Sequence, residues 1–478
     1  MDYALLIEHF SSTHQVEGWS RQRVLHEGLR AAIRTGALAG GTRLLATRTL
    51  AAELGVARNS VLYAYEQLAT EGYVVPDRRG TVVATGRGMV APSHPPPLKV
   101  GLSRRTRALQ ALPAPTTLPA GFAPGVPALD EFPMQVWRRL VERAWRSARA
   151  DDLNYGDPAG HPQLRDAIAN HLRAARGADC HARQVFITNG TQSSLDLCAR
   201  AFADAGDVAW IENPGYAGAL TALRGAQLEV HPVPTDDDGI RVRAQDWQRH
   251  RPRLVYVTPS HQYPTGAVLS LERRLALIEG ARRAHALIIE DDYDSEFRHE
   301  GPPLPAMQGL APDAPVLYLG TFSKTMFPAL RIGFIVVPQA LVAPLEEVLA
   351  RSSPRGRSAE QLALAEFLRS GQFALHLRRM RRLYRQRRDA LLAALARHMG
   401  ELGTARGGSA GMHLMFELAD KKLDDSSIFA RALEQGIVAH PLSMHGRLNG
   451  FLLGYAQVPA DKMDALVKRF ARIVRAEK

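Results

Sequence analysis

The feature that most constrains the fold is a set of seven short apolar segments, separated by helical stretches, in the second half of the chain. They are rich in β-branched residues and span 185–189, 207–212, 227–233, 253–259, 286–291, 314–320 and 331–337. Strands buried on both faces have continuous apolar sequences, and parallel strands need helical connections. The alternation therefore predicts an α/β domain with a mostly parallel sheet.

Polar clusters follow five of these segments. They occupy 189–192, 212–216, 260–262, 291–293 and 323–324. Any one of them is compatible with a helix cap or a turn. Ligands of parallel sheets bind at the carboxyl ends of strands, however, so all five together predict a single site at that edge.

One of these clusters contains an unusual lysine. The chain has 7 Lys against 53 Arg, and Lys324 is the only lysine between Lys99 and Lys421. Arginine stays protonated in proteins, whereas a desolvated lysine loses its proton and attacks a carbonyl. Lys324 is therefore a candidate nucleophile, and the question is which carbonyl it meets.

Length and composition narrow the class of protein. The 478 residues allow about three domains, and 46% hydrophobic with 23% charged residues is typical of a soluble globular protein. The net charge of +12 favours nucleic acid or anionic small molecules as partners. The two cysteines, Cys180 and Cys198, provide neither a disulfide framework nor a zinc site. No apolar run is long enough for a membrane span and no secretion signal is present, so we expect a cytoplasmic protein without a metal.

The N-terminal region has the pattern of a DNA-binding unit. Residues 47–72 predict helix, tight turn and helix, with an apolar face formed by Leu50, Leu54, Val56, Val61, Tyr65 and Leu68. The second helix opens with Arg58, Asn59 and Ser60, which suit major-groove reading. Two short strands with a basic turn follow over 72–84. The alternative is a helix–turn–helix inside an ordinary enzyme with solvated arginines.

Three segments follow from these patterns. Residues 18–85 form one compact unit, and residues 119–478 form the α/β domain. Between them, residues 86–118 are rich in proline, which removes amide donors and fixes φ. We expect this segment to be a mostly extended linker.

The first segment resembles the winged helix of GntR-type regulators over about 65 residues, including IRTGALAGGTRLLATRTLAAELGVARNSVLYAYEQLATEGYV. The resemblance implies operator DNA as partner. The contacts it implies are made by Arg48, Arg58, Asn59, Ser60, Arg79, Gly80 and Thr81. The chain departs from the family at 40–45, where GGTRLL replaces a proline-containing loop, and at Ala57, where Ser or Thr is common.

Residues 323–333 resemble the lysine motif of fold-type I pyridoxal-phosphate enzymes, and residues 120–478 agree with that family. The resemblance implies a large, mostly parallel seven-stranded sheet with a small α+β subdomain. It also implies pyridoxal 5'-phosphate as cofactor, bound by Lys324 as a Schiff base. Asp291 would then bind the ring nitrogen, Tyr293 the phenolic oxygen, and Tyr216 would stack on the ring.

The same resemblance implies a phosphate site. Thr321, Ser323 and Arg331 flank the lysine and suit a dianion, and Gly190, Thr191 and Gln192 match the amide cup at a helix N-terminus. Tyr155 resembles a residue that reaches the phosphate from a partner subunit.

Two departures bear on catalysis. Tyr263 stands where many aminotransferases have the asparagine of Asn-Pro-Thr-Gly, and Leu452 aligns with the arginine that clamps the substrate carboxylate. Without that bidentate contact a productive amino-acid pose is weakened, unless an arginine such as Arg447 replaces it.

Winged helix, linker and aminotransferase-like domain in this order resemble the MocR subfamily of GntR regulators. This implies a homodimer in which each winged helix lies near the other subunit's large domain. Binding of the cofactor, or of an amino compound that reacts with it, would alter operator affinity. Candidate signals are the cofactor itself, GABA, taurine, D-alanyl-D-alanine or an ectoine derivative. The alternatives are an aminotransferase with a DNA-binding appendage, and a regulator whose second domain only dimerises.

Overall fold

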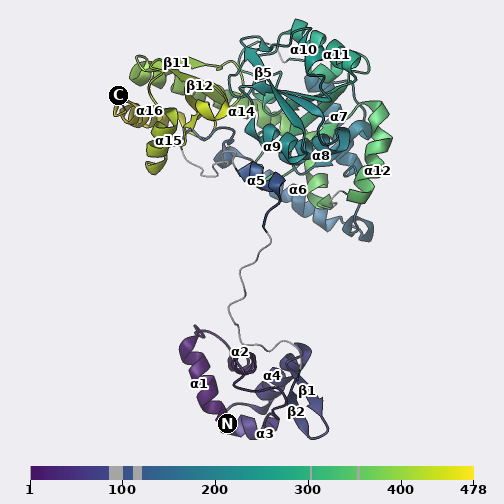
Figure 1. The fold of residues 1–478 in the computed structure, drawn as a ribbon, viewed down its shortest axis with the longest axis vertical. Coiled ribbons are helices and arrows are strands. Elements are labelled where there is room, and N and C mark those ends of the chain that lie inside the picture. The colour runs from purple at the N-terminus through teal and green to yellow at the C-terminus, as the bar shows by residue number, and fades with distance from the viewer. Residues whose placement is uncertain (1, 86–100, 111–120, 302–303, 353–355, 478) are drawn as a thin grey trace. The chain divides into compact units, whose positions relative to one another are not determined.

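The computed structural model describes residues 2–85, 101–110, 121–301, 304–352 and 356–477. The chain divides into two compact units, Met1–Gly101 and Leu102–Lys478 (Figure 1). Within these described ranges, no helix is long and apolar enough to cross a membrane. Cys180 and Cys198 are both buried and free.

Over residues 2–85, the first unit contains four helices and a two-stranded hairpin. They are α1 (Tyr3–Thr13), α2 (Arg21–Arg34), α3 (Thr47–Glu53), α4 (Arg58–Thr70), β1 (Val74–Asp77) and β2 (Gly80–Val83). The turn between α3 and α4 contains Gly55 with φ +60°, a conformation that glycine adopts without strain. The predicted helix, turn, helix and pair of short strands are therefore present.

The core of this unit is formed by side chains from all its helices. Leu29, Leu50, Val61 and Leu68 are completely buried. The unit also extends beyond the predicted start at residue 18, because α1 packs against α2 and buries Tyr3. The α1 segment lies outside the winged-helix motif, so the motif did not predict that it belongs to this unit.

The second unit is built on an eight-stranded sheet of order β3-β10-β9-β8-β7-β4-β5-β6. The strands are β3 (Val185–Thr188), β4 (Val208–Asn213), β5 (Glu229–Asp236), β6 (Gly239–Ile240), β7 (Leu254–Val257), β8 (Leu287–Asp292), β9 (Val316–Thr321) and β10 (Gly333–Val336). Strands β5, β4, β7, β8 and β9 are mutually parallel, and β10 runs antiparallel to both β9 and β3. All seven predicted strands are present, and the two-residue β6 is added at the edge.

Helices cover both faces of this sheet, so the strands are buried on each side. One apolar cluster joins the strands to α8 (Thr191–Phe202), α9 (Ala217–Gly225) and α12 (Val342–Ser352), and another joins them to α11 (Leu271–Ala284). In β7, Tyr256 belongs to the first cluster and Val255 to the second. Successive side chains point to opposite faces, which explains why the strand sequences are continuously apolar.

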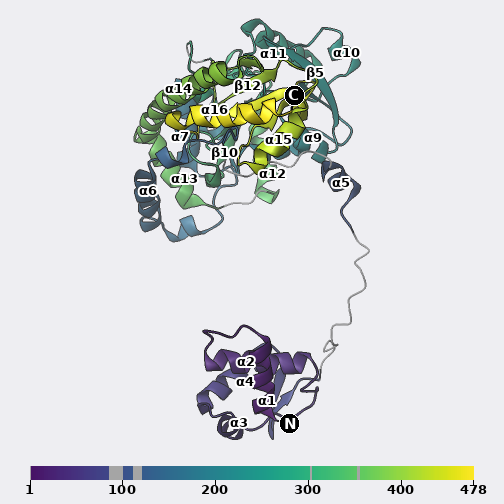
Figure 2. The same cartoon turned by 90° about the vertical axis from the view of Figure 1, so that its left-hand side faces the viewer.

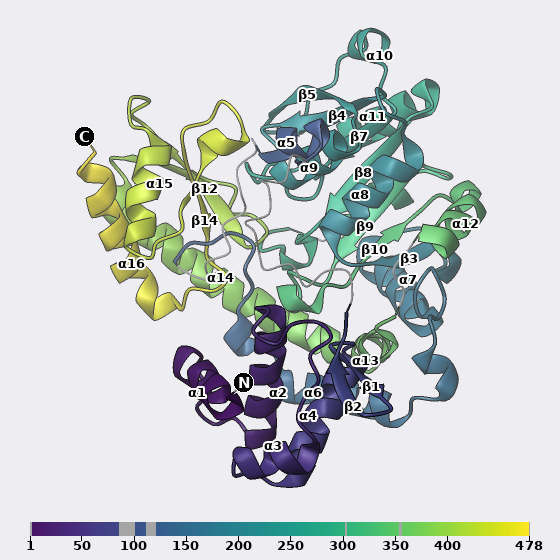
Figure 3. The ribbon, with the colours of Figure 1, turned by 60° about the horizontal axis from the view of Figure 1, so that its bottom comes forward.

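A smaller subdomain adds a four-stranded antiparallel sheet of order β11-β12-β14-β13. Its strands are β11 (Gly403–Arg406), β12 (His413–Leu418), β13 (His440–Pro441) and β14 (Gly450–Gly454), and its helices are α15 (Asp425–Glu434) and α16 (Ala460–Arg475). It lies to one side of the large sheet (Figure 3). The long helix α14 (Gln372–Met399) runs beside α16 (Figure 2). This is the small α+β subdomain that the resemblance implied.

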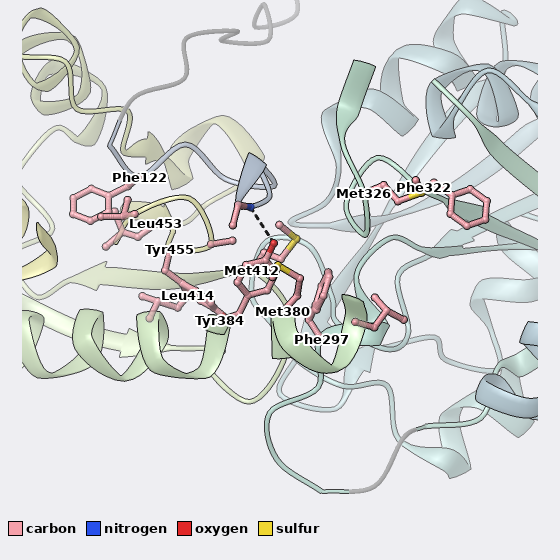
Figure 4. Packing of buried hydrophobic residues seen from close by; sticks show 14 of the residues in the cluster. Phe122, Phe297, Phe322, Met326, Met380, Tyr384, Met412, Leu414, Leu453 and Tyr455 are labelled. Carbon is pink, nitrogen blue, oxygen red and sulfur yellow. Dashed lines mark hydrogen bonds between the residues drawn. The ribbon is translucent and has the colours of Figure 1, made fainter. Parts of the chain in front are cut away.

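The two sheets share one hydrophobic core. Phe297, Tyr384 and Met412 lie together at their junction (Figure 4), and the Ala128 amide donates to the Tyr384 hydroxyl at 3.0 Å. The helices α6 (Met134–Arg146), α7 (Pro162–Arg176) and α13 (Ser358–Arg369) also contribute to this core, whereas Trp247 of α10 (Asp246–Arg249) packs against the cluster that contains α11. This shared core fixes the position of the small sheet relative to the large one.

The predicted linker 86–118 is described only over 101–110. There the chain forms the helix α5 (Arg104–Gln110), which packs against α9. A Cβ on Gly225 of α9 would lie 3.8 Å from Leu109. An extended conformation is therefore not found over 104–110, because the proline-free stretch between the prolines forms a short helix and docks on the large domain.

Candidate cofactor site and nucleic-acid interface

The ends of five strands meet at one cavity of about 280 Å³. Four of the predicted polar clusters contain a residue that lines it: Thr191 after β3, Tyr216 after β4, Asp291 on β8 and Lys324 after β9. The fifth cluster, 260–262 after β7, is followed directly by the lining residue Tyr263. The predicted convergence is thus a feature of the fold. A larger hollow of about 390 Å³ lies elsewhere, between α8, α12 and Arg357, and contains none of the predicted cofactor residues.

Lys324 lies half-buried in the wall of the cavity. Its Nζ donates to the carbonyl oxygen of Gly125 at 2.8 Å. Burial lowers the pKa of Lys324, and the charges of Asp294 and Asp291 oppose that shift without cancelling it. A lysine with a lowered pKa is more often neutral, which is the form that attacks a carbonyl.

Asp291 provides a carboxylate with one free oxygen. Its Oδ2 accepts from the Tyr256 hydroxyl at 2.8 Å, whereas its buried Oδ1 has no partner among the described residues. Burial raises the pKa of Asp291 to about 7. The adjacent Asp292 does not line the cavity, and its Oδ2 accepts from Arg176 at 2.8 Å and from Tyr318 at 2.6 Å.

A candidate anion site is the N-terminus of α8. Gly190 precedes the helix with φ +94°, no side chain caps the first turn, and a Cβ on Gly190 would lie 3.5 Å from the Arg331 guanidinium. Free amides at a helix N-terminus together with an arginine favour a phosphate. Ser323 is half-buried, and its amide donates to Thr321 Oγ1 at 3.2 Å. Gln192 instead points outward, and its Nε2 donates to the Gly218 carbonyl at 3.0 Å.

Four tyrosines line the cavity, namely Tyr216, Tyr256, Tyr263 and Tyr293. The ring of Tyr263 lies edge-on to Tyr216 at 5.5 Å and to Tyr293 at 6.1 Å. The Tyr293 hydroxyl donates to the His261 carbonyl at 2.8 Å. Burial raises the pKa of Tyr216 to about 12, so this phenol stays neutral.

Several lining residues were not anticipated from the sequence. Gly125 has φ +70°, and a Cβ there would lie 2.5 Å from Lys324 Nζ, so a side chain at this position would strain the backbone and displace the lysine amine. His413 and His440 come from the small subdomain, and Asp294 follows the predicted cluster by one residue. The contact between Gly125 and Lys324 spans 199 residues, so no local sequence pattern could predict it. The turn-forming pair Pro124-Gly125 was the one local sign that the chain bends at this point.

Asp294 also belongs to a buried polar cluster. Ligating atoms of His261, Asp294 and His413 lie within 4.8 Å of one another. His261 Nδ1 and Asp294 already pair at 3.1 Å. Burial lowers the pKa of His261, but the Asp294 carboxylate outweighs it, so the pKa is raised. The Asp294 carboxylate therefore favours the protonated form of His261.

Pyridoxal phosphate fits this arrangement. The partnerless Asp291 Oδ1 would receive the protonated ring nitrogen, and the α8 N-terminus with Arg331 would hold the phosphate. When bound, the cofactor supplies a carbonyl to amines and an electron-withdrawing ring. Tyr155 is outside the cavity, with 77% of its surface exposed. Arg447 is also exposed, whereas Leu452 is fully buried.

The candidate nucleic-acid surface is the outer face of α3 and α4. Arg48, Arg58 and Asn59 are exposed, and Arg58 Nε lies 3.5 Å from Thr47 Oγ1. Ser60 differs from the expectation, because only 9% of it is exposed and its side chain faces the core. The exposed face of α4 continues through Leu62 and Tyr63, which sequence reasoning missed.

The hairpin presents its turn to solvent. Arg79 and Gly80 are exposed, Thr81 is half-buried, and Gly80 has φ +131°. Arg43 pairs with Asp77 at 2.8 Å and ties the loop before α3 to the hairpin. The first turn of α4 has no side-chain cap, since Ala57 occupies the N-cap. The Ser60 amide donates to the Ala57 carbonyl at 2.9 Å, which leaves the amides of Arg58 and Asn59 to meet a phosphate.

Comparisons with known proteins agree with both halves of the chain. Residues 21–83 match the family model of bacterial regulatory proteins, gntR family, and residues 121–470 match aminotransferase class I and II. The crystal structure of a multiple substrate aminotransferase from Thermococcus profundus superposes with a TM-score of 0.69 at 27% identity, over 79% of this chain and 96% of that one. LysN, an α-aminoadipate aminotransferase from Thermus thermophilus complexed with N-(5'-phosphopyridoxyl)-L-leucine, gives 0.68 at 29%, over 78% and 95%.

Curated relatives contain both units. The probable rhizopine catabolism regulatory protein MocR of Rhizobium meliloti is 42% identical over 455 residues, which is 92% of this chain and 91% of that protein. The pyridoxine biosynthesis transcriptional regulator PdxR of Corynebacterium glutamicum is 35% identical over 451 residues, 92% of each. The chain therefore belongs to the MocR subfamily of GntR-type transcriptional regulators, in which a winged helix–turn–helix is joined to an aminotransferase-like domain that binds pyridoxal phosphate.

Proposed function

We propose that this regulator binds operator DNA through α4 and the β1–β2 hairpin, and that chemistry at Lys324 sets its affinity for that DNA. The observation that carries the proposal is Lys324 in a cavity with the free Oδ1 of Asp291, within the same chain as a winged helix. The signal is either the cofactor itself or an amino compound that displaces Lys324 from it. A ligand changes DNA affinity only as far as it binds the two states of the protein unequally.

On the DNA side, Arg58 and Asn59 would read base edges in the major groove. Arg48 and the amides of the α4 first turn would contact phosphates, and Arg79, Gly80 and Thr81 would follow the backbone or the minor groove. The exposed Leu62 and Tyr63 extend this surface along α4. Ser60 is left out of the contact set, because it is buried.

We also propose a homodimer. Tyr155 is 77% exposed, and nearby Leu153 and Trp145 are 71% and 55% exposed, which is an unusual surface for a monomer. In a dimer this surface would be covered, and Tyr155 would reach the cofactor phosphate of the partner. Light scattering of the purified protein tests the assembly, and a monomeric mass at micromolar concentration would contradict it.

The decisive experiment is DNA affinity at fixed salt, with and without pyridoxal phosphate. The probe is the DNA upstream of the protein's own gene. We expect the cofactor, or the cofactor with an amine, to change affinity by about tenfold, which corresponds to about 1.4 kcal/mol of coupling. Lys324→Ala should bind the same DNA without responding.

Equal affinity of the wild-type protein under all these conditions would refute the regulatory coupling. The enzyme alternative is separated by a turnover assay with several amino donors and 2-oxo acids on the same preparation. The enzyme alternative rests on Lys324, Asp291 and Tyr216, which line one cavity, as the cofactor site of a transaminase would require. Multiple turnovers per chain, without any effect on DNA, would favour that alternative.

A further inference from the structure

Position 452 faces the cavity side of the small sheet. Leu452 on β14 lies directly opposite Met415 on β12 and His440 on β13. Residues opposite one another in antiparallel strands point to the same face, and His440 lines the cavity. A long side chain at position 452 would therefore extend toward the site.

The residue at this position is apolar and so are its surroundings. Leu452 is completely buried in a cluster with Met415 and Leu442, against which Tyr263 and Leu448 pack. Tyr263 also lines the cavity, so this apolar cluster forms part of its outer wall. None of these five residues carries a positive charge toward the site.

The cavity offers no other cation to an anionic ligand. Among the described residues that line it, Lys324 is the only basic side chain other than histidine, and Asp291 and Asp294 are acidic. Arg331 lies at the α8 N-terminus, where a phosphate belongs, and Arg447 does not line the cavity. Apart from Lys324 and the histidines, none of the described lining residues offers a ligand carboxylate a cationic partner.

The lining histidines do not supply the missing charge. Burial lowers the pKa of His440, and burial together with His261 and Lys324 lowers the pKa of His413 well below its usual value. Both imidazoles are therefore neutral near pH 7. What remains are hydrogen-bonding groups without charge, including the hydroxyls of Tyr216, Tyr263 and Thr191.

We infer that the amine recognised at Lys324 lacks a carboxylate or sulfonate and carries hydroxyl or other uncharged polar groups. This inference rests on the proposed function and specifies the class of ligand for the same site. Leu452 is the residue that selects against amino acids, because the bidentate arginine–carboxylate contact is absent there. The lining hydroxyls and imidazoles select for neutral polar groups.

The test is a titration of the full-length protein loaded with pyridoxal phosphate, with ligands that share one aminoethyl stem. Ethanolamine, β-alanine and taurine differ only in the group at the far end, and serinol and L-serine form a second matched set. The readouts are the absorbance of the bound cofactor and the affinity for DNA. We expect ethanolamine and serinol to act at concentrations at least about tenfold lower than their anionic counterparts, because a carboxylate or sulfonate would be desolvated in the cavity without a cationic partner.

Equal or better binding of L-serine, β-alanine or taurine would overturn the inference. The inference would also be wrong if the protein binds the cofactor with normal absorbance but responds to none of these ligands. In that case the proposed function would survive if the cofactor alone changes DNA affinity. Failure of the cofactor to attach to Lys324 would instead remove the proposed function itself. The two failures are thus distinguishable in one data set.

A variant adds an independent check. Leu452→Arg should reverse the preference, so that L-serine acts at lower concentrations than serinol, because the new guanidinium can pair with the carboxylate. Leu452→Met alters the shape without adding charge and should keep the wild-type order of ligands. If Leu452→Arg does not fold, the wild-type titration with matched ligands decides the question alone.

Discussion

Replacing Asp291 by asparagine is the sharpest test of how this domain holds its cofactor. Asp291 Oδ2 is occupied by the Tyr256 hydroxyl at 2.8 Å, so only Oδ1 is free to meet a ring nitrogen. An asparagine side chain has nearly the same shape and would keep the Tyr256 contact through its amide oxygen. Its NH₂ group cannot stabilise a protonated ring nitrogen, so the Asp291→Asn variant isolates the charge of the carboxylate.

The expected loss follows from the strength of that one contact. A hydrogen bond between charged groups contributes about 1.5–3 kcal/mol net, which is roughly 10- to 150-fold in the dissociation constant. The matched control is Asp292→Asn, because Asp292 is bonded to Arg176 and Tyr318 and does not line the cavity. This control should lower the melting temperature but change cofactor affinity by less than about threefold.

The assay is an absorbance titration of cofactor-free protein with pyridoxal phosphate at fixed pH and salt. It is repeated in the Lys324→Ala background, where covalent attachment no longer contributes. If Asp291→Asn bound the cofactor within about threefold of wild type and with the same absorbance, the ring nitrogen would have another partner. The assignment of Asp291 would then be wrong.

Three further predictions concern DNA binding, folding and pH. If Arg58 reads a base, Arg58→Ala should weaken operator binding by about 1–3 kcal/mol in a gel-shift titration. Arg58→Lys keeps the charge and should recover only part of the lost affinity. Equal affinity of the wild type and both variants would exclude the contact. Leu29→Ala removes a fully buried side chain from the N-terminal core and should lower the free energy of unfolding of that unit by about 2–5 kcal/mol. Calorimetry should show a lower first unfolding transition and an unchanged second one. A uniform shift of both transitions would contradict separate units. Burial raises the pKa of Glu212 to about 7, against the opposing hydrogen bonds from Thr258. Between about pH 4.5 and 7 the folded state therefore holds a proton that the unfolded state has lost. The stability of the folded state falls as the pH rises through that window. Glu212→Gln should therefore lose less melting temperature than wild type between about pH 5 and 8, and an identical pH profile would argue against a buried, protonated Glu212.

The sequence by itself determined the elements and their chemistry. Seven of the eight strands of the large sheet follow from continuous apolar segments, and the turn at Gly55 follows from local residue preference. Lys324 was conspicuous because arginine is the usual cation in this chain. Such features are short-range, so they are encoded in a few neighbouring residues.

Only the tertiary structure decided which residues complete the site. Gly125 meets Lys324 across 199 residues, and His413 and His440 arrive from a different sheet. Contacts of this kind depend on how α14 and the shared core set the small subdomain against the large one, and no local pattern records that packing. The same reason explains the burial of Ser60 and the attachment of α1, since both are set by helix packing in the N-terminal core.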